Sequence, residues 1–75
     1  MQKVNIAKLK GAIVEHGYTI DALAMDIGLS RATMHRKLKS AGKFTIDDIE
    51  KIVNVLKLQA QEAMEIFFPT WQDGL

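Results

Sequence analysis

The stretch that decides the fold is "LAMDIGLSRATMHRKL", residues 23–38. Apolar residues recur at helical spacing on both sides of Gly28, so the stretch predicts two helices joined at that glycine. Glycine readily adopts the left-handed conformation that ends helices, and Ser30 is a good N-cap for a helix that begins at once. Ala24, one turn before the glycine, lets two steeply crossing helices approach closely. The stretch therefore predicts a helix-turn-helix, whose turn and packing residues are Leu23, Ala24, Ile27, Gly28, Leu29 and Met34.

The helices on the N-terminal side can be predicted from their ends. Asn5 is suited to cap a first helix with apolar residues at helical spacing, and Gly17 is suited to stop it. The helix that precedes the turn follows Thr19, whose hydroxyl can accept a hydrogen bond from a first-turn N–H group. Gly42 is predicted to close the helix that begins at Ser30.

Two more helices are predicted after residue 43. Thr45 and Asp48 are spaced as a capping box, which predicts the start of a fourth helix. A fifth helix is predicted over residues 60–68, with Pro69 stopping it. Because no alternating strand pattern occurs, the fold class is predicted to be all-α, with five short helices in one domain over residues 1–75 and a short tail over 69–75.

The composition excludes several classes of site. The 75 residues contain no cysteine, so disulfides and thiolate metal sites are absent. No apolar run approaches the roughly 18 residues that a membrane span needs. His16 and His35 have no closely spaced histidine partner, and the chain has no glycine-rich phosphate loop and no nucleophile motif. We therefore expect no enzyme, no metal, no cofactor, no membrane contact and no small-molecule ligand.

The charges are distributed unevenly along the chain. Residues 27–46 carry five basic side chains and no acid, while the rest of the chain carries five basic and nine acidic side chains. A solvated face is the commoner explanation of a charge run. A clear asymmetry of sign inside a domain this small nevertheless favours a polyanionic partner.

The stretch "LAMDIGLSRATMHRKL", residues 23–38, resembles the helix-turn-helix of the phage Cro and repressor proteins, the XRE-type family of DNA-binding regulators. "GKFTIDDIEKIVNVLKLQAQEAMEIFF", residues 42–68, is similar to the last two helices of that family's compact five-helix, lambda-repressor-like domain. One position departs from the family pattern, because Lys37 stands where an aliphatic residue is usual and Leu38 follows it. A rotated third helix would instead present Thr33 and Lys37 to the DNA.

The resemblance implies that the helix after Ser30 enters the major groove of double-stranded DNA. The preceding helix then acts mainly as a strut, and its acids can face away from the duplex. Carried over by position, the base-reading residues are Arg31, Ala32, Thr33 and Arg36. Arginine can pair with the two acceptors of guanine, and small apolar groups can touch the thymine methyl. The phosphate contacts are expected from Thr19, Ser30, His35, Lys37, Lys39 and Lys43.

Each of these roles has a simpler alternative. Thr19 and Ser30 can be plain helix caps, Ala32 a plain helix former, and Lys39 a cation favoured by the negative end of the helix dipole. The rival function is a helical protein-interaction module, such as an antirepressor, adaptor or antitoxin on the same fold.

The expected partners follow from the DNA-binding prediction. One short helix reads only a few base pairs, so we expect a homodimer on a palindromic operator. The possible dimer surface is apolar and comprises Phe67, Phe68 and Trp71, although Phe67 and Trp71 can also simply complete the core. The expected location is the cytoplasm of a bacterial or phage-infected cell, in association with the nucleoid.

Overall fold

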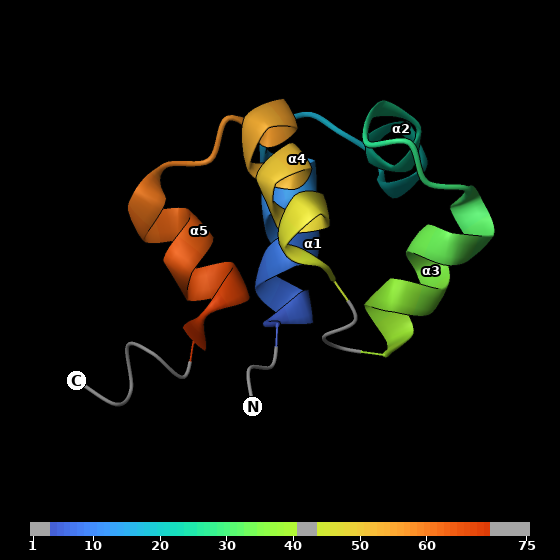
Figure 1. Ribbon diagram of the computed structural model, residues 1–75. Coiled ribbons are helices and arrows are strands. Elements are labelled where there is room, and N and C mark those ends of the chain that lie inside the picture. The colour runs from blue at the N-terminus through green and yellow to red at the C-terminus, as the bar shows by residue number, and fades with distance from the viewer. Residues whose placement is uncertain (1–3, 41–43, 70–75) are drawn as a thin grey trace.

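The part of the chain that the structure describes folds into five α-helices, shown in Figure 1. The computed structural model describes residues 4–40 and 44–69, and no strand occurs within them. The helices are α1 (Ile6–Glu15), α2 (Ile20–Asp26), α3 (Arg31–Lys39), α4 (Ile46–Leu56) and α5 (Ala60–Phe67). The predicted all-α fold with five helices is therefore confirmed. Gly42, the predicted end of the third helix, lies outside the described residues, and α3 itself ends at Lys39.

Side-chain caps explain where four of the helices begin. The side chains of Asn5, Thr19 and Ser30 each accept a hydrogen bond from a backbone N–H in the first turn of the following helix. At α4 the predicted capping box is present, since Thr45 and Asp48 each accept a hydrogen bond from the other's backbone N–H, at 3.0 and 3.1 Å. These bonds satisfy N–H groups that have no partner inside the helix.

The turn between α2 and α3 is closed by two backbone hydrogen bonds. The N–H of Leu29 donates to the carbonyl of Ala24 at 2.9 Å, and the N–H of Gly28 donates to Met25 at 3.2 Å. This Schellman arrangement requires a left-handed residue, and Gly28 has a φ of 80°. A Cβ atom built on Gly28 would meet nothing within 4 Å, so its backbone conformation, and not a lack of space, explains the glycine.

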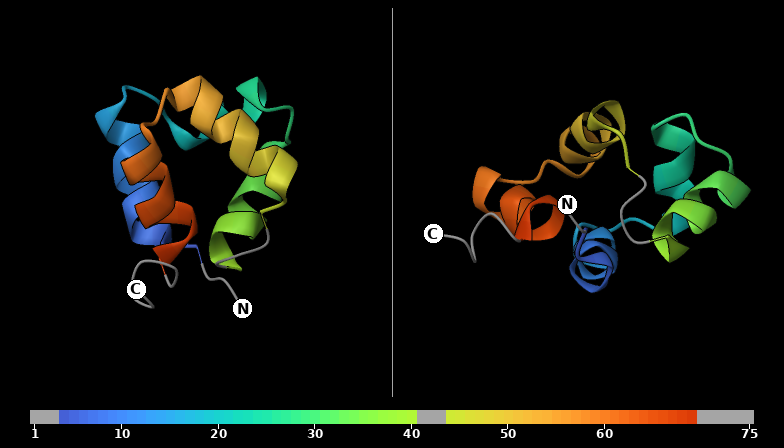
Figure 2. Two further views of the ribbon diagram at one scale, coloured as in Figure 1. Left: turned by 60° about the vertical axis from the view of Figure 1, so that its left-hand side comes forward. Right: turned by 60° about the horizontal axis from the view of Figure 1, so that its bottom comes forward.

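The core is shared by all five helices. α2 contacts α1, α3 and α4, and α5 packs against α1. Figure 2 shows α1 and α5 side by side, with α4 crossing towards α3. The largest fully buried side chains are Leu9, Ile13, Leu23, Met34, Ile52, Leu56, Ile66 and Phe67. Ala24 is also buried, as the close crossing of α2 and α3 requires.

Three polar contacts join α5 to α1. The N–H of Asn5 donates to the carbonyl of Ile66 at 2.7 Å, and the ammonium of Lys8 lies 3.0 Å from the carboxylate of Glu65. Near the other end of α1, Nε2 of His16 lies 3.4 Å from Glu62. These contacts hold the two antiparallel helices in one register.

Of the two roles left open for Phe67, a dimer surface or completion of the core, the structure shows the second. Phe67 is 1% exposed, and its ring meets that of Phe44 edge to face, with centroids 6.3 Å apart. Its position on α5 places it towards the core, where burial of a large aromatic side chain is most favourable. Phe68 is half-buried against the same core. Trp71 lies outside the described residues.

Candidate nucleic-acid interface

The outer face of α3 is cationic. Met34 and Leu38 are buried under the helix, whereas Ala32, His35, Arg36 and Lys39 are exposed. These four residues follow helical spacing and therefore share one face. Within residues 4–40 and 44–69, neither the guanidinium of Arg36 nor the ammonium of Lys39 has an ion-pair partner. The face is thus able to bind an external anion.

The first turn of α3 is linked to the first turn of α2 by Asp21. One carboxylate oxygen of Asp21 lies 2.9 Å from Nη2 of Arg31, and the other lies 3.5 Å from Nε2 of His35. Asp21 therefore lies beside the exposed face of α3 and does not face away from it. The steep crossing brings the start of α2 beside the exposed face of α3, which the sequence spacing does not reveal.

Lys37 occupies a different environment from the other cations of α3. Its ammonium lies 3.0 Å from the carboxylate of Asp48 and 5.9 Å from the centroid of the Phe44 ring. Its side chain is only 18% exposed. The side chain therefore joins α3 to α4, an arrangement that disfavours the predicted contact of Lys37 with DNA phosphate. Lys37, which stands where the family pattern has an aliphatic residue, is thus largely buried and pairs its charge with Asp48.

Asp48 is held as a carboxylate by these neighbours. Burial by itself raises its pKa, but the hydrogen bond from Lys37, the bond from the Thr45 backbone and the attraction of the ammonium together outweigh it. The pKa of Asp48 is consequently lowered from its ordinary value of 3.8.

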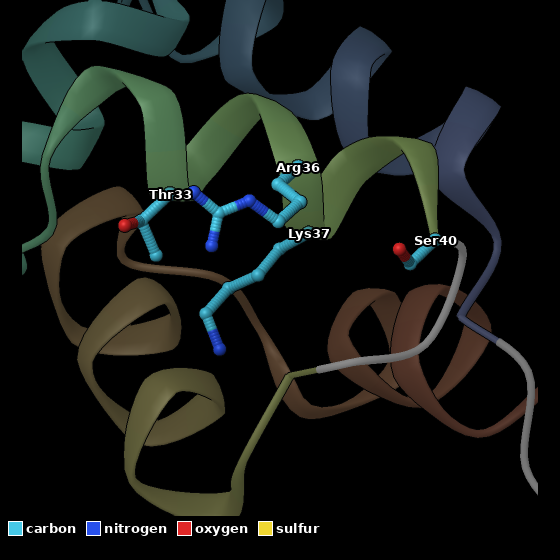
Figure 3. A pocket seen from close by; sticks show the side chains of 4 residues that line it. All are labelled: Thr33, Arg36, Lys37 and Ser40. Atoms are coloured by element: carbon cyan, nitrogen blue, oxygen red, sulfur yellow. The ribbon is translucent and has the colours of Figure 1, made fainter.

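A shallow hollow runs along the edge of α3 that faces the start of α4. It is lined by Thr33, Arg36, Lys37 and Ser40, which are drawn in Figure 3. In that view Lys37 extends from α3 towards α4, while Arg36 lies along α3 towards Thr33. Ser40 was not singled out from the sequence, although its spacing of seven residues from Thr33 would have placed both on one face.

The hydroxyl groups near the helix starts are already engaged as caps. Ser30 Oγ accepts from the N–H of Thr33 at 3.1 Å and donates to the Thr33 hydroxyl at 2.8 Å. Thr19 Oγ1 accepts from the N–H of Ala22 at 3.0 Å. Both residues are exposed, so their hydroxyls border the surface around α3 while capping their helices. Lys43 lies outside the described residues.

A cluster of possible metal ligands is formed by residues that are not part of α3. Ligand atoms of Glu15, His16 and Glu62 lie within 4.8 Å of one another in the described part of the chain. The sequence could not reveal the cluster, because Glu62 comes from α5 and the other two residues come from the end of α1. The contact between His16 and Glu62 already accounts for part of it. None of the helices in the described segments is both long and apolar enough to span a membrane.

Comparison with known proteins agrees with this geometry. The family model described as the Cro/C1-type helix-turn-helix DNA-binding domain matches residues 8–69, from α1 to the end of α5. No curated protein matches the chain. The family match spans most of the chain and includes the turn at Gly28 and the cationic helix that follows it. The chain therefore belongs to the Cro/C1-type helix-turn-helix DNA-binding domains, a family of DNA-binding regulators.

Proposed function

We propose that this domain is a transcriptional repressor of the Cro type, which binds a specific double-stranded DNA sequence with α3 in the major groove. The observation that carries the proposal is the exposed face of α3, which has no acidic residue and whose cations Arg36 and Lys39 have no partner within the described residues. Phosphates attract such a face irrespective of sequence, and the bases select among sites.

Specificity is assigned to the first two turns of α3. Arg31 and Arg36 are proposed to pair with guanine in the major groove, with Ala32 and Thr33 against the thymine methyl or a neighbouring base edge. All but Thr33 are exposed, and Thr33 is half-buried at the edge of the hollow. The proposed phosphate contacts are Thr19, Ser30, His35, Lys39 and Lys43.

A dimer on a palindromic operator completes the proposal. The nine residues of α3 reach only a few base pairs, too few for a useful specificity. Two copies of a helix-turn-helix domain bind half-sites about 34 Å apart on one side of the duplex. Because Phe67 is buried, the surface that joins the copies does not include that side chain.

The direct test is selection of binding sites from a random pool of duplexes, followed by footprinting. We expect an enriched sequence with two related half-sites about one helical turn apart. A single unrepeated half-site with one protein bound would contradict the dimer. Failure to enrich any sequence would contradict specific DNA binding.

Salt dependence supplies an independent test. If a dimer contacts roughly 6–10 phosphates, its affinity should fall by about 10³–10⁵ between 50 and 200 mM salt. Absence of retention on random DNA at low salt would instead favour a protein-interaction module. Retention on a heparin column at low salt offers a rapid first measurement.

A further inference from the structure

Asp21 is an acid at the edge of a surface proposed to bind phosphates. It lies in the first turn of α2, and its two oxygens face Arg31 and His35, which are one turn apart on α3. An acid in this place repels any DNA, so its charge alone weakens binding. Its contacts with two side chains of the reading helix point to a second effect.

The contact with Arg31 restricts a long side chain without using all of its donors. Arg31 is 75% exposed, and a free arginine loses considerable conformational entropy when it is fixed on a base. Asp21 approaches Nη2, whereas a guanidinium has five N–H donors, so others stay available for the acceptors of guanine. The pair is also exposed and hence weak, so Asp21 can orient Arg31 without withholding it from DNA.

We propose that Asp21 is a positioning residue for sequence recognition, which orients Arg31 towards its base pair and so increases the preference for the operator over random DNA. This inference rests on the proposed function. Asp21 then has opposite effects on two quantities. Its charge lowers affinity for every duplex, and its contact with Arg31 raises the ratio of operator affinity to random-DNA affinity.

The test measures that ratio for four variants of the full chain, on the duplex selected above and on a scrambled duplex. The variants are Asp21→Ala, Asp21→Asn, Arg31→Ala and the double variant Asp21→Ala with Arg31→Ala. Asp26→Ala is the matched control, because Asp26 is an exposed acid of the same helix that pairs with no cation in the described residues. Far-UV circular dichroism establishes that each variant is folded at the temperature of the titration.

We expect Asp21→Ala to bind scrambled DNA at least as tightly as the unaltered chain but to lower the ratio by about two- to fivefold, the size of an exposed ion pair. Asp21→Asn should retain part of the ratio, since its amide oxygen can accept a hydrogen bond from Arg31. In the Arg31→Ala background, removing Asp21 should leave the ratio unchanged. Asp26→Ala should alter both affinities equally.

The inference is overturned if Asp21→Ala leaves the ratio unchanged, if Asp26→Ala lowers it as much, or if Asp21→Ala lowers it equally with and without Arg31. A simple change in stability would lower both affinities together and leave the ratio constant. If the unaltered chain prefers no duplex, the proposed function fails instead, and that result appears before any variant is made.

Discussion

Two ion pairs of α3 have similar geometry but differ in burial, and this difference gives them different roles. Lys37 and Asp48 keep 18% and 11% of their side-chain surface exposed, whereas Arg31 and Asp21 keep 75% and 47%. The separations are almost equal, at 3.0 and 2.9 Å. The buried pair holds α3 against α4 and costs stability when one member is removed. The exposed pair is weak and can be exchanged for a ligand.

The largest expected effect comes from breaking the buried pair. Asp48→Ala removes the capping box of α4 and leaves the ammonium of Lys37 poorly solvated, so the free energy of unfolding should fall by about 2–4 kcal/mol. Urea denaturation at pH 7 measures this change. The control is Asp47→Ala, whose carboxylate is 70% exposed and pairs with Lys51, and whose loss should cost less than about 1 kcal/mol. Equal losses for both variants would show that the helix dipole accounts for the cost, and that neither the capping bond of Asp48 nor its pair with Lys37 contributes.

Removal of Arg31 should affect DNA binding and leave stability almost unchanged. Arg31→Ala is expected to cost about 1–3 kcal/mol on the selected duplex, and to relax the preference at one base pair in each half-site. The melting temperature should hardly change, because the side chain is exposed. Lys39→Ala is the comparison, since loss of a phosphate contact weakens selected and scrambled duplexes alike and reduces the salt slope by about one per protomer. If Arg31→Ala weakened both duplexes equally, its assignment as a base reader would be incorrect.

Acid should weaken the buried pair in a predictable direction. The pKa of Asp48 is lower in the folded chain than its ordinary value of 3.8, so its carboxylate contributes stability that is present above that value. This contribution is lost as the pH falls through the lowered pKa of the folded state, where the acid becomes protonated. The difference in unfolding free energy between the unaltered chain and Asp48→Asn should therefore narrow between pH 7 and pH 2. A constant difference across that range would indicate that the charge of Asp48 does not matter.

The smallest effect is expected when both members of the buried pair are replaced together. Lys37→Met with Asp48→Asn keeps the net charge, the approximate volume and an acceptor for the N–H of Thr45. Stability should change by less than about 1.5 kcal/mol, because a well-packed neutral pair replaces an ion pair at little cost. DNA affinity should change by less than about threefold if Lys37 makes no phosphate contact. A large loss of DNA affinity without a loss of stability would indicate that Lys37 does contact DNA phosphate.

The same comparison shows what the sequence could predict. Local signals sufficed for the helix starts at Asn5, Thr19, Ser30 and Thr45, and for the turn at Gly28, because a cap or a left-handed glycine acts within a few residues. The family resemblance predicted the fold and the DNA-binding class. The roles of individual residues in DNA recognition remain predictions.

The partners of the charged residues could not be predicted in this way. Lys37 and Asp48 are separated in sequence, and only the packing of α3 on α4 brings them together. Asp21 reaches Arg31 because the crossing of α2 and α3 brings the first turn of one helix beside the first turn of the other. Phe67 shows the same limit, since an apolar residue near a helix end can finish a core or form a surface, and the packing of α5 decides between them.

The hydrogen bond from Asn5 to Ile66 has a consequence for the order in which the protein can fold. During synthesis, α1 emerges first, but the partner of its capping residue is the carbonyl near the end of α5. The helix-turn-helix can begin to pack as soon as α2 and α3 are available, whereas α1 reaches its final surroundings only when α5 has been made. A ribosome-bound chain that stops before α5 should therefore expose the apolar side of α1 and be digested rapidly by protease. Extension of that chain past residue 69 should bring protection in a single step, because long-range contacts close last.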